Sequence, residues 1–178
     1  MKTTSLFPAG ADERKRFRLI RLCMLLSGLS VFAQLYLFQP LLSELCGYYQ
    51  VSAVGGSLAV SSSTLGMAAG LFVLAFRADA VSRARLMGFS LIVSSLLTLL
   101  SPLAFSFPLL LLVNFLKGAV LAGVSAVALA YLTEEVDARV IGLAISLYLS
   151  GNTLGGMAGR VSGTLLAGWA GWHTAVLV

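Results

Sequence analysis

The long uncharged segments of this chain leave few folds open to it. Twenty-two uncharged residues separate Arg21 from Glu44, and 32 separate Glu44 from Arg77. About 20 apolar residues in a helix cross the ~30 Å hydrocarbon core of a bilayer, so each segment is long enough to span it. Neither segment alternates apolar and polar residues as the strands of a membrane β-barrel do. The sequence therefore predicts an all-α, polytopic membrane helical bundle.

Composition excludes several other classes of protein. The 178 residues are 58% hydrophobic and only 11% charged, whereas about 25% of a soluble domain is charged. A water-soluble globular enzyme, a disordered chain and a collagen are therefore excluded. The two cysteines, Cys23 and Cys46, would lie about 34 Å apart along one helix, which is too far for a disulfide bond. They are expected to pack as small apolar residues.

Helix-breaking residues divide the chain into five complete spans and the start of a sixth. Breaks are expected at Gly47 to Tyr49, at the charged segments 77–85 and 133–139, between Pro102 and Pro108, and from Gly168 to Trp172. The expected spans are residues 20–43, 51–76, 86–104, 108–132, 140–167 and a segment that begins near residue 173.

The basic residues predict the orientation in the membrane. Six of the 12 Lys and Arg residues precede the first long uncharged segment, which begins after Arg21, and the segments 77–85 and 133–139 carry four more. The three loops on the opposite side carry none. This positive-inside pattern places residues 1–18, the basic N-terminal segment, in the cytoplasm. We therefore expect a multi-pass protein of the inner cell membrane, with Tyr48, Tyr49, Trp169 and Trp172 at the outer interface.

The basic N-terminus has two other interpretations, and neither fits. A cleaved signal peptide has an apolar core of about 7–15 residues followed by a small-residue cleavage site. Residues 22–43 are longer than such a core, and no such site follows them. The basic residues are better explained as a topology signal that faces lipid than as an arm that binds nucleic acid.

Small residues recur every four positions within the expected spans. Apolar helices in lipid associate through close backbone contact, which small residues permit. These ladders therefore predict a tightly packed bundle, and smooth glycine faces would also let helices slide or rock. The ladder of the fifth span is Gly151, Gly155, Gly159 and Gly163, that of the fourth is Gly118, Ala122, Ala126 and Ala130, and that of the second is Ser62, Gly66 and Gly70.

Two basic residues lie deep within the expected spans. Lys117 falls near the middle of the fourth span and Arg160 in the outer half of the fifth. Such a residue at a helix centre costs at least ~2.5–3.5 kcal/mol to insert, so it needs a partner, a cavity or a route to the headgroups. A water-filled basic cavity is the favoured interpretation. The partners expected for the two residues are waters, backbone carbonyls, Asn114, Asn152, Gln34 and Gln39.

One motif resembles the active site of an enzyme, but the different depths of its residues in the membrane exclude that function. Gly123-Val124-Ser125 with His173 resembles the Gly-x-Ser and His dyad of rhomboid intramembrane proteases. Ser125 would lie about 25 Å below the outer end of its helix, whereas His173 would lie at the outer surface. A nucleophile and its base must be within hydrogen-bond reach. With no cluster of metal-ligating residues and no phosphate-binding loop in the sequence, we expect no enzyme, no cofactor and no metal.

The segment from Ala75 to Arg85 resembles a loop motif of the major facilitator superfamily. It reads Ala-Phe-Arg-Ala-Asp-Ala-Val-Ser-Arg-Ala-Arg, and the family motif is Gly-x-Leu-Ala-Asp-Arg-x-Gly-Arg-Arg. Asp79 and Arg83 match the two charged anchors of the motif. Ala75, Arg77 and Ser82 depart from its Gly, Leu and Gly.

Further stretches strengthen the resemblance. The segment 114–118 resembles the fourth-span motif Arg-x-x-x-Gly, with Asn114 in the place of the Arg. The segments 131–135 and 150–160, together with Gln39-Pro40, are similar to bacterial inner-membrane transporters of an efflux type. The resemblance covers residues 18–178 and matches the N-terminal half of a twelve-span family. Residues 19–178 are thus interpreted as the transmembrane N-terminal half-domain of a transporter.

The resemblance implies a function and a set of site residues. Members of the family move a small-molecule substrate by rocking two six-helix halves about a site near the midplane, often with a coupling ion such as H+. The loss of the fourth-span Arg leaves proton coupling by this half in question, and Lys117, one turn on, is the expected substitute. The residues of the cytoplasmic gate would be Asp79, Arg83, Arg85, Glu134 and Glu135, and those of the substrate pathway Gln34, Gln39, Asn114, Lys117, Asn152 and Arg160.

A second function class stays open on the sequence alone. Only about six residues of the sixth span are present, too few to cross a bilayer with their backbone groups satisfied. This favours a chain that lacks its C-terminal half. Such a chain is either part of a secondary transporter or a non-transporting membrane protein, which would be a degenerate fragment or a structural or regulatory partner of another half.

Overall fold

The chain folds as a bundle of helices. The computed structural model describes residues 11–76, 82–136 and 140–177, and these residues contain no strand. The all-α fold predicted from the uncharged segments is confirmed. The helices are α1 (Ala11–Tyr36), α2 (Leu42–Tyr49), α3 (Ala53–Ala75), α4 (Arg83–Leu100), the short 3-10 helix η2 (Ser101–Leu103), α5 (Phe107–Glu135) and α6 (Ile141–Leu177).

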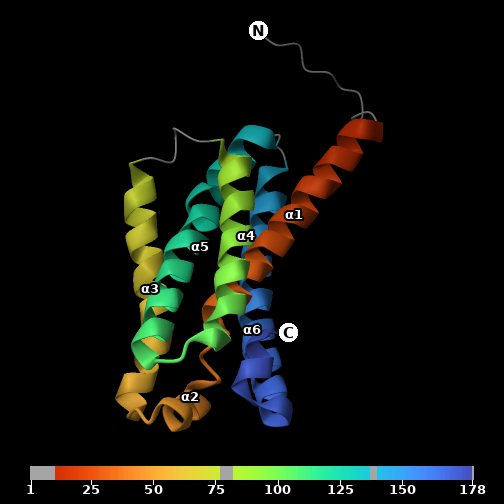
Figure 1. Ribbon diagram of the computed structural model, residues 1–178. Coiled ribbons are helices and arrows are strands. Elements are labelled where there is room, and N and C mark those ends of the chain that lie inside the picture. Colours follow the sequence, from red (N-terminus) through yellow and green to blue (C-terminus); the bar gives the residue numbers. More distant parts are fainter. Residues whose placement is uncertain (1–10, 77–81, 137–139, 178) are drawn as a thin grey trace.

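The long helices run up and down between two ends of the bundle. The start of α1, the end of α3, the start of α4, the end of α5 and the start of α6 lie at one end, which is the upper end in Figure 1. The short helix α2, the start of α3 and the connection from α4 to α5 lie at the other end (Figure 1). The described helix ends that flank the two segments expected to be cytoplasmic therefore lie at the same end as the start of α1.

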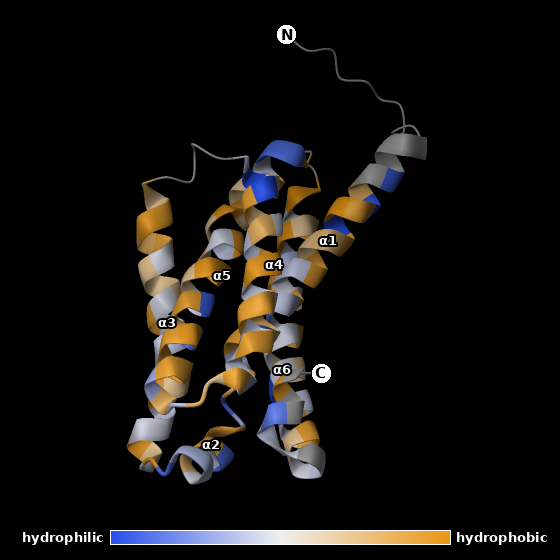
Figure 2. Ribbon diagram, in the orientation of Figure 1, coloured by the Kyte–Doolittle hydropathy of each residue, from blue (hydrophilic) through white to orange (hydrophobic). Residues whose placement is uncertain are grey.

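Four helices in the described parts of the chain are long and apolar enough to cross a membrane. They are Phe17–Tyr36, Ala53–Ala75, Arg83–Leu103 and Phe107–Glu135. The expected fifth span, 140–167, lies within α6, which has the length but contains many Gly, Ser and Thr residues together with Asn152 and Arg160. Figure 2 shows this helix as paler than α3, α4 and α5, whose ribbons are mostly hydrophobic.

The first span ends earlier than the sequence analysis predicted. A continuous helix over 20–43 was expected, but α1 ends at Tyr36, and α2 begins only at Leu42. Pro40 explains the correction, because its ring would clash with the carbonyl of the residue four positions earlier, which is Tyr36. The break leaves Gln39 and Pro40 between the two helices, and buries Phe38 and Leu41 in the core.

The expected break between Gly168 and Trp172 is present within α6. Gly171 has a φ of 77°, which is non-helical and which glycine adopts without steric cost. After this residue the chain turns back along the bundle (Figure 1). Trp172 and Val176 are buried in a core cluster with Phe38 and Leu45, so the last described residues close one end of the bundle.

Two helix pairs form the closest contacts, and glycines make both possible. On α6, a Cβ added at Gly151 or Gly155 would overlap the carbonyl oxygen of Leu25 or Leu29 on α1. Two more glycines continue the row, since Gly159 lies against Ala33 and Gly163 lies against Leu37 and Pro40. On α5, Gly118 lies against the carbonyl of Ser63 on α3, and Gly66 and Gly70 of α3 lie against the carbonyls of Phe115 and Ala119. The ladder of the fifth span therefore packs on the first span, and that of the fourth on the second.

Many large apolar side chains face outward along the spans. Leu65, Phe72 and Phe89 are each more than half exposed. An apolar exterior of this extent is typical of a surface covered by lipid or by another protein segment.

Candidate functional site

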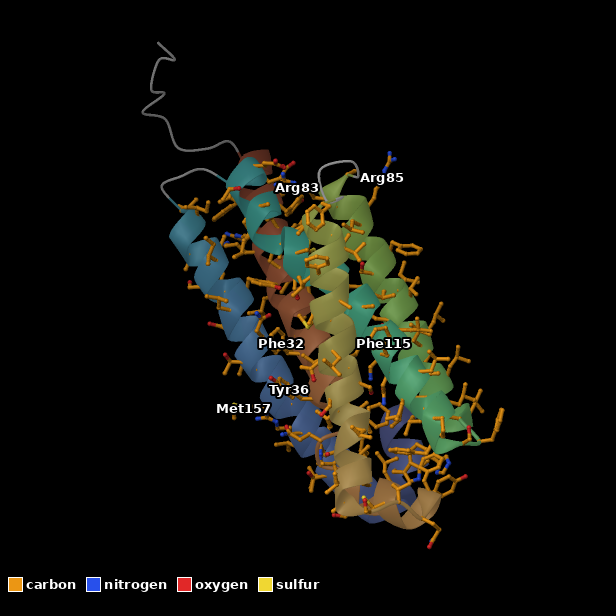
Figure 3. The ribbon with its side chains drawn as sticks, turned by 90° about the vertical axis from the view of Figure 1, so that its left-hand side faces the viewer. Phe32, Tyr36, Arg83, Arg85, Phe115 and Met157 are labelled. Carbon is orange, nitrogen blue, oxygen red and sulfur yellow. The ribbon has the colours of Figure 1, made fainter. Side chains whose placement is uncertain are left out.

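An ion pair joins two helices at the end of the bundle where α1 starts. Arg83, at the start of α4, lies 3.0 Å from a carboxylate oxygen of Glu134, near the end of α5. Both residues belong to the predicted gate set, as do the exposed residues Arg85 and Glu135. Figure 3 shows Arg83 and Arg85 at this end. Asp79, the remaining member, lies outside the described residues.

Lys117 and Asn114 are fully buried in the middle of α5. The ammonium nitrogen of Lys117 lies 4.5 Å from the centroid of the Phe38 ring. Neither this nitrogen nor the side-chain amide of Asn114 has a hydrogen-bond partner within the described parts of the chain. The Lys117 side chain thus contacts an aromatic ring and has no exposed surface in this arrangement, and the water-filled basic cavity stays a prediction.

Gln34 connects α1 to α4. Its amide nitrogen lies 3.4 Å from the Ser95 hydroxyl, and its carbonyl oxygen accepts a hydrogen bond of 3.1 Å from Thr98. The three residues line a pocket of about 360 Å³ together with apolar side chains of α1 and α6. Ser162 of α6 is the fourth polar side chain of the lining. Because all four polar side chains are neutral, this pocket offers hydrogen bonds but no charge.

Arg160 and Gln39 are brought together from positions 121 residues apart. The Nε of Arg160 donates a hydrogen bond of 2.7 Å to the Gln39 side-chain oxygen. The guanidinium carbon lies 4.5 Å from the centroid of the Tyr36 ring. The break at Pro40 ends α1 at Tyr36. Gln39 therefore lies in the connection to α2, where it can contact Arg160. Arg160 thus has one of the partners expected for it from the sequence.

A groove of about 240 Å³ adjoins Arg160. Its lining comes from α1 and α6 and includes Asn152, which is also one of the predicted pathway residues. Figure 3 shows Phe32, Tyr36 and Met157 close together where the two helices meet. The groove is lined by Phe32, Tyr36, Asn152, Thr153, Gly156, Met157 and Arg160.

The structure divides the predicted pathway residues between three places. Asn152 and Arg160 line the groove, and Gln39 is bound to Arg160 beside it. Gln34 lines the neutral pocket, and Asn114 and Lys117 of α5 are buried inside the bundle. Sequence reasoning missed the aromatic and thioether part of the groove, which consists of Phe32, Tyr36 and Met157. Two spacings could have identified it, because Phe32 and Tyr36 are four residues apart, and Met157 and Arg160 three, which places each pair on one helix face.

Aromatic residues gather at the other end of the bundle. Tyr48, Tyr49, Trp172 and His173 contact one another, with Trp172 and His173 ring centroids 3.8 Å apart. The Tyr49 hydroxyl donates a hydrogen bond of 2.6 Å to the Ala104 carbonyl. Burial, with a smaller contribution from nearby Tyr48, raises the pKa of Tyr49 to about 12. His173 thus belongs to this aromatic cluster.

No group of three or more His, Cys, Asp or Glu residues that could hold a metal ion occurs within the described ranges. The two cysteines are free. The pocket and the groove offer hydrogen bonds, aromatic rings and the Arg160 guanidinium to a ligand.

Comparison with known proteins points to one family. The sequence profile of the Major Facilitator Superfamily matches residues 22–178. The chain is 35% identical over 160 residues to the uncharacterized MFS-type transporter YybF of Bacillus subtilis. The aligned region is 90% of this chain and 40% of that protein. It is 34% identical over 161 residues to the inner membrane transport protein YnfM of Escherichia coli. That aligned region is 90% of this chain and 39% of YnfM.

A third relative is an uncharacterized transporter of Buchnera aphidicola subsp. Schizaphis graminum, 33% identical over 164 residues, which is 92% of this chain and 40% of the relative. The chain therefore spans about two fifths of the length of the curated relatives that it matches. No solved structure matches it.

Proposed function

Since this chain belongs to the Major Facilitator Superfamily, we propose that it forms the N-terminal half of a secondary transporter that exports a small organic solute by alternating access. The observation that carries the proposal is the match of the family profile to residues 22–178. Membrane-crossing helices that place polar groups between them are what this function requires.

The proposed pathway follows the polar residues of α1, α5 and α6. Gln34 lines the neutral pocket and Arg160 lines the groove, and Gln39 is bound to Arg160. Asn114 and Lys117 are enclosed, so in this proposal they become accessible in another state of the transport cycle. Coupling to an ion such as H+ would then involve Lys117, one turn from the position where the family has an Arg.

The proposed gate is the charged end of the bundle. The Arg83–Glu134 ion pair holds the start of α4 against the end of α5. With Asp79, Arg85 and Glu135 it would form the part of the cytoplasmic gate that this half supplies. The positive-inside pattern supports a cytoplasmic position for this end in the inner membrane.

A C-terminal half is the proposed partner. Because the chain spans about two fifths of its relatives, the remaining helices of the transporter would come from that second half. The alternative of a non-transporting membrane protein makes the opposite prediction for the experiment below.

The test is transport by the completed protein. The chain is fused to the C-terminal half of YnfM, and everted membrane vesicles are supplied with radiolabelled sugars, amino acids and carboxylates in turn. We expect at least one solute to accumulate above the level in vesicles that lack the fusion, and the chain alone to move none. A fusion that inserts in the membrane but moves no solute would contradict the proposal.

Lys117→Ala in the same fusion tests the residue proposed for coupling. We expect it to abolish accumulation driven by a proton gradient. Accumulation equal to that of the unaltered fusion would overturn the role of Lys117 and leave the rest of the proposal intact.

A further inference from the structure

Arg160 has a guanidinium that is only partly used. Its Nε is bound to the Gln39 oxygen at 2.7 Å, and one face lies over the Tyr36 ring. No hydrogen bond joins its two terminal amino groups to any described residue, and no described acidic side chain forms an ion pair with it. The contacts to Gln39 and Tyr36 therefore fix the orientation of the group and leave its outer edge open.

That open edge has the geometry of a carboxylate site. The amino groups of a guanidinium form a planar fork that binds the two oxygens of a carboxylate side by side. Fixing the plane beforehand reduces the side-chain freedom that binding would otherwise remove. In addition, an arginine within a segment expected to cross the membrane is stabilised by a counter-charge. An anionic ligand would provide it.

The rest of the groove is suited to the apolar part of such a ligand. Phe32 and Tyr36 form one wall and Met157 lies on the other. Rings and a flexible thioether contact flat apolar or aromatic groups well. Gly156 keeps this space open, because a Cβ there would lie 3.3 Å from the Tyr36 ring. The volume of about 240 Å³ is below the ~300 Å³ at which sites for drug-sized ligands begin, so the ligand is small.

We propose that Arg160 and the adjoining groove bind a small organic carboxylate, with the carboxylate on the guanidinium and an aromatic or apolar body between Phe32, Tyr36 and Met157. This rests on the proposed function and names the substrate class for it. Anionic lipid headgroups offer a similar negative charge, but a phosphodiester with its two acyl chains is much larger than the groove of about 240 Å³.

Binding to the purified chain tests the proposal independently of transport. The chain in a neutral maltoside detergent is titrated calorimetrically with 4-phenylbutyrate and with 4-phenylbutan-1-ol, which share an aromatic body and differ in the carboxylate. We expect the acid to bind at least about fivefold more tightly than the alcohol, because only the acid forms charge-assisted hydrogen bonds. Equal affinities for the two compounds would overturn the proposal.

Arg160→Gln is expected to weaken binding of the acid about tenfold and to leave binding of the alcohol within about twofold. Arg18→Gln is the matched control, because it removes the same charge from an exposed position near the start of α1. Circular dichroism and the alcohol affinity report whether the variant retains its fold and groove. Unchanged binding of the acid to Arg160→Gln would contradict the assignment.

A second pair of variants avoids the removal of Arg160. Met157→Glu places a carboxylate three residues before Arg160 on the same helix face, where it would occupy the open edge of the guanidinium. Met157→Gln has nearly the same shape without the charge. We expect the Glu variant to lose at least about tenfold in affinity for 4-phenylbutyrate, and the Gln variant less than about threefold. Equal losses would overturn the proposal.

Phosphatidylglycerol added to the same chain distinguishes the lipid source. Binding of this lipid that is lost in Arg160→Gln, without any binding of 4-phenylbutyrate, would assign the groove to a headgroup and refute the carboxylate proposal. The transport proposal and the carboxylate-site proposal can also be refuted independently of each other. A fusion that transports only neutral solutes supports transport and not this site, whereas Arg160-dependent binding without transport supports this site alone.

Discussion

Glycine residues determine how closely α1 approaches α6. Gly151, Gly155 and Gly159 lie against backbone carbonyls of α1 that are themselves four residues apart. A side chain at any of these positions would have to push one helix away from the other. In a bilayer, where lipid tails are as apolar as leucine, this backbone contact is a main source of helix association.

Gly155→Ala is therefore expected to destabilise the chain by about 1–3 kcal/mol through overpacking. The added methyl group would overlap the carbonyl oxygen of Leu29. Thermal unfolding in detergent, followed by circular dichroism, measures the effect. Gly88→Ala is the control, because a Cβ there has no neighbour within 4 Å, and the alanine should leave stability unchanged or raise it slightly. Equal effects of the two substitutions would contradict this account of the glycine ladder.

Lys117 illustrates the cost of a polar side chain in the core. It is fully buried, and its nitrogen has no hydrogen-bond partner within the described part of the chain. Lys117→Met keeps the length of the side chain and removes the amine, so we expect it to stabilise the chain by at least about 1 kcal/mol. Lys15→Met, at an exposed position, should change stability little. Loss of stability in Lys117→Met on thermal unfolding would contradict an unpartnered amine.

At the scale of the elements, Pro40 shapes one end of the bundle. It ends α1 at Tyr36, frees Gln39 to reach Arg160, and lets α2 lie across the end of the bundle (Figure 1). The short helix is then attached to the connection between α4 and α5 through the Tyr49–Ala104 hydrogen bond. One residue therefore contributes both to the groove and to the closure of this end.

The attachment of α2 predicts a dependence on alkaline pH. Burial raises the pKa of Tyr49 from 10.0 to about 12, so the folded chain keeps the phenol proton that the unfolded chain releases near pH 10. The contribution of Tyr49 to stability should be complete below pH 10 and be lost as the pH rises towards 12. Unfolding temperatures measured from pH 8 to pH 12 test this expectation.

Tyr49→Phe separates this effect from other alkaline changes. It removes the hydrogen bond to Ala104, which should cost about 1 kcal/mol at neutral pH, and it should flatten the decline above pH 10. Tyr48→Phe, with an exposed ring, serves as the control and should keep the decline. A decline of the same size in Tyr49→Phe would show that another group is responsible.

At the scale of the whole molecule, the two ends of the bundle differ in chemistry. One end has the Arg83–Glu134 ion pair, and the other has the aromatic cluster around Trp172. Basic residues favour the cytoplasmic side and aromatic rings favour an interface. This asymmetry gives the orientation of the bundle a direct test.

Single cysteines placed at Arg85 and Tyr48, in a chain with Cys23 and Cys46 changed to Ser, should react from opposite sides of the membrane. Both positions are exposed. A membrane-impermeant maleimide added to intact cells is expected to label the cysteine at position 48, and the same reagent added to everted vesicles the cysteine at position 85. Labelling of both positions from one side would refute the proposed topology.

The positions of the spans could be predicted from the sequence to within a few residues, except at Pro40. Residues 51–76 and 108–132 correspond to α3 and α5, and the break before Trp172 is at Gly171. The site was harder to predict. Gln39 and Arg160 were among the residues expected to line a pathway, but Phe32, Tyr36 and Met157 were not distinguishable from other apolar residues of a membrane helix.

By itself, therefore, the sequence determined that this protein is helical, crosses a membrane and has a basic end, because apolar length and charge are properties of consecutive residues. The tertiary structure decided that the glycines of α6 meet α1, that Arg160 meets Gln39 across 121 residues, and that Lys117 is enclosed. These outcomes depend on which helix faces meet and at what depth, and that choice is made by the packing of all the helices together.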